Sequence, residues 1–148
     1  YGGRIGKKQR KIATVKGTKK SYTFTGCKKA TMYQFQIEAR NGSKKKAVSK
    51  TINVMAAGGK WKNPDRVTAK KKTVTIKAGA KYTLTPKVKS KGNVKYTGRK
   101  FYYECQNKKI VKINKKGKVT ALKKGSTNIY IYTQNRKYQK VRFVVRRK

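Results

Sequence analysis

Few side chains in this chain could carry out acid–base or nucleophilic chemistry. The carboxylates are Glu38, Asp65 and Glu104, the thiols are Cys27 and Cys105, and there is no histidine. A cysteine nucleophile needs a histidine or an equivalent base, and hydrolysis of a glycosidic bond needs two carboxylates placed across that bond. Metal sites use the same residue types. We therefore expect a protein that is not an enzyme and that has no catalytic residues, no cofactor and no metal site.

The chemistry that the sequence does offer is positive charge. Of 148 residues, 44 are lysine or arginine and 3 are acidic, which gives a formal net charge of +41. Only nine of the basic residues are arginine. Arginine binds planar anions through a bidentate fork, whereas lysine is a hydrated point charge on a flexible stem. The lysine excess therefore favours diffuse attraction to polyanions over recognition of one anion by its shape.

Basic clusters occur along the whole chain. A single cluster is typical of a solvated face, but solubility does not require the total, because a surface of mixed sign is soluble without so much self-repulsion. We expect the partners to be anionic polymers or an anionic cell surface, such as teichoic acid, sulfated or sialylated glycan, anionic lipid or extracellular DNA. The candidate polyanion-binding residues, all diffuse in character, are Lys44, Lys45, Lys46, Lys70, Lys71, Lys72, Lys115, Lys116, Lys123, Lys124, Arg142, Arg146 and Arg147.

Nucleic-acid binding as the main function is an alternative. Tyr102, Tyr103, Tyr130 and Tyr132 are interleaved with basic charge and could stack on bases. Ordinary strand propensity accounts for these tyrosines more simply, because no recognition motif accompanies them. A further alternative is an accessory module of a larger secreted wall or glycan hydrolase.

Alternation of apolar and polar residues with a period of two runs through the chain, and helical periodicity is absent, so the predicted fold class is all-β. The expected strands are residues 12–15, 21–25, 32–40, 50–55, 72–77, 81–88, 101–105, 110–113, 118–122, 127–133 and 138–145. Seven or more short strands in the second half predict a complete antiparallel β-sandwich. Its expected inward-facing residues are Val74, Ile76, Leu84, Tyr103, Ile113, Val119, Ile129, Ile131 and Val141.

Domain boundaries follow from where the alternation stops. Residues 58–66 gather glycine, asparagine and proline, so we expect a linker there, between one domain at residues 1–57 and another at 67–148. No run of about 18 apolar residues occurs, and we expect no transmembrane segment. Cys27 and Cys105 fall in different expected domains, and each is predicted to be a small core residue with a free thiol.

Residues 110–129, with the sequence IVKINKKGKVTALKKGSTNI, contain a turn with Gly117, a Lys-Val-Thr run and a second glycine, Gly125. This pattern resembles the signature of the bacterial group 2 immunoglobulin-like (Big) family, and residues 74–79 and 82–85 resemble its opening strands. Tyr103 opens a run that stands where the family usually has Trp-x-Ser-Ser-Asn, which exchanges one core aromatic residue for another. The resemblance covers about residues 67–145 and implies structural roles for Tyr103, Gly117 and Gly125.

Residues 26–33, with the sequence GCKKATMY, resemble the Gly-Leu-x-x-x-Thr-x-Tyr run of fibronectin type III domains. The resemblance extends over residues 21–55 and implies that Tyr33 is a tyrosine-corner residue and that Cys27 occupies a buried leucine position. Only 20 residues precede Ser21, too few for the earlier strands, so this first domain is expected to be truncated. Upstream residues or a partner chain would then cover its apolar face, which is formed by Tyr22, Phe24, Tyr33, Phe35 and Ile37.

The two resemblances together imply tandem immunoglobulin-like β-sandwiches, the first one truncated. Families of this kind usually occur as repeated non-catalytic modules of secreted or wall-attached bacterial proteins. The expected function is therefore that of an extracellular or cell-wall-associated spacer or adhesion arm. Fold alone does not fix function, and both folds occur in proteins with many different functions.

Overall fold

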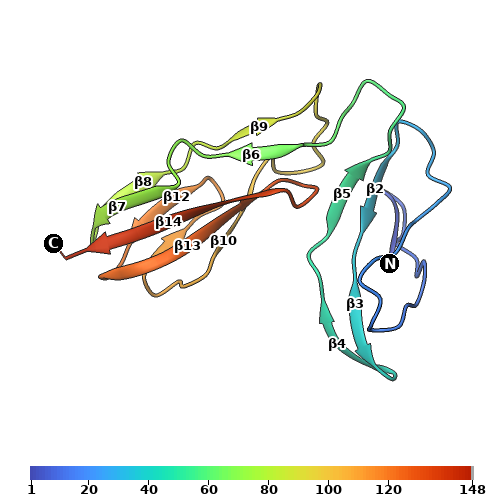
Figure 1. The fold of residues 1–148 in the computed structure, drawn as a ribbon, viewed down its shortest axis with the longest axis horizontal. Coiled ribbons are helices and arrows are strands. Elements are labelled where there is room, and N and C mark those ends of the chain that lie inside the picture. Colours follow the sequence, from blue (N-terminus) through green and yellow to red (C-terminus); the bar gives the residue numbers. More distant parts are fainter. Residues whose placement is uncertain (148) are drawn as a thin grey trace. The chain divides into compact units, whose positions relative to one another are not determined.

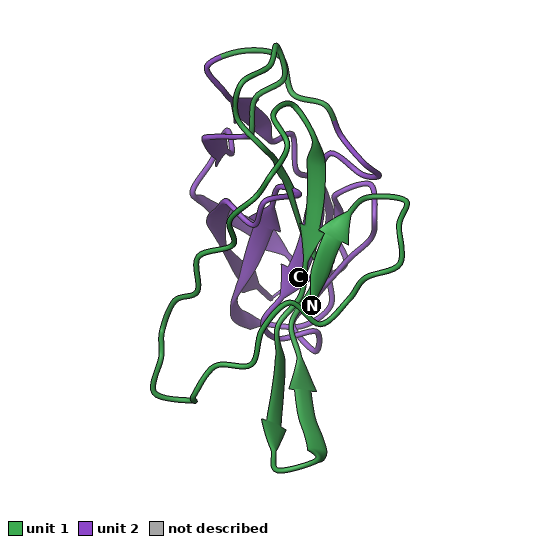
Figure 2. Cartoon of the chain, turned by 90° about the vertical axis from the view of Figure 1, so that its right-hand side faces the viewer, with its two compact units in different colours: residues 1–63, 92–95 green, residues 64–91, 96–148 purple. Residues whose placement is uncertain are grey.

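The computed structural model describes residues 1–147, so that expectations for Lys148 lie outside the described residues. Over this range the chain forms fourteen strands and no helix, as the all-β prediction requires (Figure 1). The chain divides into two compact units (Figure 2). The N-terminal unit comprises residues 1–63 and 92–95, and the C-terminal unit comprises residues 64–91 and 96–148.

The N-terminal unit has a three-stranded antiparallel sheet in the order β1-β2-β5, formed by β1 (Gly2–Arg4), β2 (Met32–Phe35) and β5 (Ile52–Met55). A separate hairpin pairs β3 (Glu38–Asn41) with β4 (Lys44–Val48). Its two-residue loop begins with Gly42 at a φ of 57°, a conformation that matches the twist of paired strands. Residues 92–95 join this unit through Lys62, whose backbone N–H donates to the carbonyl oxygen of Asn93 at 2.8 Å.

The expected strands at residues 12–15 and 21–25 are wrong, because neither segment lies in a strand. Alternation alone does not make a strand, because a strand also needs hydrogen bonds to a neighbouring strand, and residues 12–15 and 21–25 form no such pairing. Strand β1 was missed because two glycines in three residues give no alternating signal. The expected strand at residues 32–40 divides into β2 and β3, and at the break the backbone N–H of Ile37 donates to the Ser49 hydroxyl at 2.9 Å.

The apolar face of the N-terminal unit is only partly covered. Phe24, Tyr33 and Phe35 form an aromatic cluster with ring centroids 5.3–6.2 Å apart, and Tyr33 is buried. Tyr22 and Ile37, however, are 55% and 71% exposed. Tyr22 and Ile37 lie outside the strands of this unit, and the covering of the apolar face by upstream residues or a partner chain stays a prediction.

The C-terminal unit is a sandwich of two main sheets. The four-stranded sheet has the order β10-β13-β14-β7, with β10 (Tyr102–Cys105), β13 (Gly125–Tyr132), β14 (Tyr138–Arg146) and β7 (Thr73–Lys77). The three-stranded sheet has the order β11-β12-β8, with β11 (Val111–Ile113), β12 (Lys118–Ala121) and β8 (Lys81–Thr83). A third pair joins β6 (Arg66–Thr68) to β9 (Lys87–Lys89).

The core of the C-terminal unit contains the inward-facing residues that alternation predicted. Six of the nine are buried, and Ile76, Tyr103 and Ile113 are partly buried and pack against them. Phe143 and Val145, on alternate positions of β14, extend the same core. The buried six are Val74, Leu84, Val119, Ile129, Ile131 and Val141.

Two strand expectations for the C-terminal unit need correction. The sandwich is not wholly antiparallel, because β14 pairs with β7 in parallel. The sequence gives alternation but not strand direction, and β7 leaves the four-stranded sheet to continue as β8 of the other sheet. The expected strand at residues 81–88 divides into β8 and β9 around Pro86, which has no backbone N–H to donate across a sheet.

Candidate functional site

All thirteen candidate polyanion-binding residues are exposed, but the structure does not gather them into one site. Those of the N-terminal unit lie on β4. Those of the C-terminal unit are spread over the β6–β7, β11–β12 and β12–β13 connections, over β14 and just after it. Arg142 is the exception to this dispersal, because its backbone N–H donates to the carbonyl oxygen of Lys72 at 2.8 Å and brings two of the clusters side by side.

One lysine of β4, Lys45, contacts one of the three acidic residues. Glu38 is ion-paired with Arg40 and, at 3.4 Å, with the ammonium group of Lys45. Desolvation alone would raise the pKa of Glu38, but hydrogen bonds and attraction from these two cations outweigh it, so the pKa is lowered. The carboxylate is therefore charged at neutral pH and partly neutralises this end of the hairpin.

The turn between β11 and β12 presents Lys115 and Lys116 on a well-defined scaffold. The side-chain oxygen of Asn114 accepts hydrogen bonds from the backbone N–H groups of Lys116 and Lys118, at 2.9 and 3.0 Å. Gly117 has a φ of 82°, and a Cβ placed there would lie 2.8 Å from the Tyr103 hydroxyl oxygen. The geometry fits the structural roles that the resemblance implied for Tyr103 and Gly117.

The remaining structural predictions have mixed outcomes. The Tyr33 hydroxyl oxygen accepts a hydrogen bond from the backbone N–H of Lys28 at 2.9 Å, a contact of the tyrosine-corner type. Gly125 has a φ of 146°, and a Cβ there would lie 2.9 Å from Ile110. The prediction of a buried Cys27 is wrong: it is exposed, because it lies in the long connection between β1 and β2 and not in a strand.

Cys105, in contrast, packs against the core. It is partly buried on β10, and its Sγ lies 3.5 Å from the carbonyl oxygen of Val111, to which the thiol donates. Both cysteines are free thiols. Within residues 1–147 no group of three or more cysteine or acidic side chains could hold a metal ion, and no helix is long and apolar enough to cross a membrane.

Sequence reasoning singled out Tyr130 and Tyr132 but not Tyr138, which joins them in an aromatic group on the outer face of the four-stranded sheet that we call the tyrosine face. Tyr138 lies opposite Tyr132, and the ring centroids of these two are 5.7 Å apart. Tyr130 packs on both, at 6.3 Å from Tyr132 and 5.8 Å from Tyr138. The guanidinium carbon of Arg136 lies 3.7 Å from the centroid of the Tyr132 ring, and Arg136 donates to Glu104 at 3.0 Å.

Burial raises the pKa of Tyr132, and the negative charge of Glu104 acts in the same direction, while Arg136 opposes both. Alternation already placed Tyr130 and Tyr132 opposite the buried residues of β13. The position of Tyr138 depends on the register between β13 and β14, which no local pattern specifies. That is why only part of the tyrosine face could be found from the sequence.

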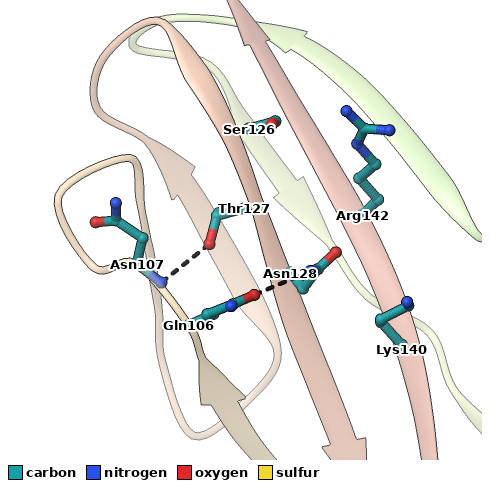
Figure 3. Close-up of a pocket in the computed structure, with 7 residues that line it drawn as sticks. All are labelled: Gln106, Asn107, Ser126, Thr127, Asn128, Lys140 and Arg142. Atoms are coloured by element: carbon teal, nitrogen blue, oxygen red, sulfur yellow. Dashed lines mark hydrogen bonds between the residues drawn. The ribbon is translucent and has the colours of Figure 1, made fainter.

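A polar depression of about 560 Å³ lies on the same sheet (Figure 3). It is next to the tyrosine face, because Lys140, which lines it, is paired with Tyr130 across β13 and β14. The side-chain amide of Asn128 donates to the side-chain oxygen of Gln106 at 2.9 Å, and the backbone N–H of Asn107 donates to the Thr127 hydroxyl at 2.9 Å. We use the name polar depression for this hollow together with the residues that line it. Its lining residues are Gln106, Asn107, Ser126, Thr127, Asn128, Lys140 and Arg142.

Two facing sheets around one apolar core, with strand connections that pass between the sheets, define the C-terminal unit as an immunoglobulin-like domain. Residues 65–145 match the bacterial Ig-like domain (group 2) family. The chain belongs to this family. A comparison with curated proteins found no match.

Solved structures with a similar fold include parts of the S-layer protein SbsC. Its domains 4 and 5 are 24% identical over 67% of this chain and 62% of that one, with a TM-score of 0.46. Its domains 1–6 are 20% identical over 80% of this chain and 16% of that one, with a TM-score of 0.48. This chain therefore spans less than two thirds of the length of either structure.

Proposed function

We propose that this chain is a non-catalytic module of a bacterial surface protein, extracellular or wall-associated, that acts as a spacer or adhesion arm. It binds anionic polymers such as teichoic acid or anionic glycan through diffuse lysine charge. Membership of the bacterial Ig-like family supports the location and the spacer function. The observation that carries polyanion binding is the excess of positive over negative charge. The chain has 44 basic and 3 acidic residues, and every candidate basic residue is exposed.

Lysine charge of this kind acts only over short distances at physiological salt. At about 0.15 M the Debye length is about 8 Å, so affinity for a polymer comes from many simultaneous contacts. Each neutralised charge on a polyelectrolyte releases a counterion, and log affinity then falls linearly with log salt. Binding is therefore expected to be strong, weakly selective and steeply dependent on salt.

We also propose that the N-terminal unit is the C-terminal part of a fibronectin type III-like domain. The hydrogen bond between Lys28 and Tyr33 supports this assignment, and so does the exposure of the large apolar side chains Tyr22 and Ile37. Residues upstream in a longer chain, or a partner chain, complete this sandwich.

The function is tested by measuring the binding of the full chain to teichoic acid, heparin, duplex DNA and a neutral glycan between 0.05 and 0.5 M NaCl. We expect binding to all three polyanions, a linear loss of log affinity with log salt, and slopes of similar size, near −0.9 for each phosphate contacted on duplex DNA. The neutral glycan is the control. Selective binding to it that survives about 0.5 M salt, where screening acts over about 4–5 Å, would contradict the proposal.

A further inference from the structure

The outer face of the four-stranded sheet carries successive rows of side chains that change from aromatic to polar and cationic. The odd-numbered residues of β13 from 127 to 131 are buried, so the even-numbered ones lie on the outer face. Neighbouring rows are about 7 Å apart along each strand, because two residues separate them. The rows across β13 and β14 are Tyr132 with Tyr138, Tyr130 with Lys140, and Asn128 with Arg142.

The aromatic end of these rows is ordered by its own contacts. Tyr138 is 61% exposed, while Tyr130 and Tyr132, on the adjacent strand, are partly buried and pack against its ring. Arg136 has a φ of 62° in the β13–β14 turn, and in this conformation its guanidinium group lies on the ring of Tyr132. Glu104, opposite Tyr130 on β10, accepts a hydrogen bond from the guanidinium group and so fixes its position. The rings are thus held in place before any ligand arrives.

We propose that the tyrosine face and the polar depression together bind a segment of an anionic polysaccharide. This inference rests on the proposed function and gives it a defined site. Sugar rings pack their C–H faces on the tyrosine rings, whose faces carry negative charge density. Sulfate or carboxylate groups on the next residues of the glycan pair with Lys140 and Arg142, and its hydroxyl groups bond to the amides of Gln106 and Asn128.

Several features of the site favour a glycan over a single-stranded nucleic acid. Tyr130 and Tyr132 are nearly parallel, at 21°, but the most exposed ring, Tyr138, is tilted by 59° and 48° to them and so does not extend that pair as a further parallel face for successive bases. The carboxylate of Glu104 lies within the face, where it is paired with Arg136 and can accept hydrogen bonds from hydroxyl groups. Amides such as Asn128 both donate and accept, as sugar hydroxyls do.

The proposal is tested on the full chain with three probes at 0.15 M NaCl: a heparin oligosaccharide, inorganic polyphosphate and oligo(dT). Polyphosphate has charge but no rings. We expect Tyr138→Ala to weaken heparin binding about tenfold, the size of one lost stacking contact, and to leave polyphosphate binding within about twofold of the wild type. Tyr138→Phe keeps the ring and should bind heparin like the wild type. Tyr22→Ala, at another exposed tyrosine, is the matched control and should have no effect.

A second comparison tests the cationic end without touching the aromatic rings. Arg142→Gln and Arg147→Gln remove the same charge from two exposed arginines, but only Arg142 lines the polar depression. We expect heparin affinity to fall several-fold more in Arg142→Gln than in Arg147→Gln, and polyphosphate affinity to fall equally in both. Equal losses for heparin would show that only total charge matters and would overturn the site.

The possible outcomes separate the two proposals. Wild-type protein that binds neither heparin nor polyphosphate contradicts the proposed function itself. Wild-type binding to both, with Tyr138→Ala unchanged for heparin, leaves the proposed function standing and overturns the site. A loss confined to oligo(dT) assigns the face to nucleic acid, and an equal loss for heparin and polyphosphate shows that the tyrosine does not contact sugar. A thermal melt of each variant identifies any loss that comes from unfolding.

Discussion

At the scale of single residues, the Tyr33 hydroxyl has one defined task in the N-terminal unit. It accepts the backbone N–H of Lys28 and so fixes the end of the long connection that precedes β2. Tyr33→Phe removes this bond but keeps the buried ring, so we expect the free energy of unfolding to fall by about 1 kcal/mol. Urea unfolding followed by the fluorescence of Trp61, the single tryptophan, reports on this unit. Tyr22→Phe, at an exposed ring, should leave the curve unchanged.

Gly117 is a position where backbone conformation and packing both require glycine. Its φ of 82° disfavours any side chain, and a Cβ would also lie 2.8 Å from the Tyr103 hydroxyl oxygen. Gly117→Ala should therefore destabilise the C-terminal unit by about 2–4 kcal/mol, measured by calorimetry. The double variant Gly117→Ala with Tyr103→Phe should lose less than the sum of the two single variants, because the hydroxyl is gone. Simple additivity would show that the close contact does not matter.

Tyr103 also makes stability depend on alkaline pH. Burial raises its pKa above the ordinary value of about 10, so the folded state holds the proton more tightly than the unfolded state does. Its contribution to stability is complete below the unfolded pKa and is lost as pH rises towards the folded pKa. Stability of the wild type should therefore fall more steeply above about pH 10 than that of Tyr103→Phe. Lysines titrate in the same range in both proteins, so the difference between the two curves isolates the tyrosine.

At the scale of elements, β13 shows how one strand supplies both the core and the outer surface. Ile129 is fully buried, and its replacement by alanine leaves a cavity between the two sheets, so Ile129→Ala should cost about 2–5 kcal/mol. Leu122, 39% exposed after β12, is the matched aliphatic control, and Leu122→Ala should cost much less. Melting temperatures of the C-terminal unit measure both. Similar losses would mean that the inward face of β13 is not the centre of the core.

The success of sequence reasoning also varies by element. Alternation located Ile129 and Ile131 in the core, because a half-buried strand repeats with a period of two. It failed at residues 12–15 and 21–25, where the pattern is present but neither segment pairs with a strand. Only part of the tyrosine face could be predicted. The contact between Tyr138 and Tyr132 depends on the strand register, which only the folded sheet sets.

At the scale of the whole molecule, self-repulsion among the positive charges opposes folding. Salt screens this repulsion, so we expect the melting temperature of the free protein to rise between about 0.02 and 0.5 M NaCl, while its affinity for polyanions falls. Replacing Lys44, Lys45 and Lys46 with glutamine should reduce the salt dependence of melting. A melting temperature that is independent of salt would show that the charges are spaced widely enough not to interact.

The parallel pairing of β7 with β14 gives the C-terminal unit a mechanical property. Residues 73–77 are hydrogen-bonded alongside residues 142–146, and the two strands run in the same direction. Force applied at the first residue of β7 and the last residue of β14 loads these hydrogen bonds in shear, so that they are strained together and not opened one after another. Rupture then requires several bonds to break at once. We therefore expect this domain to unfold slowly under force.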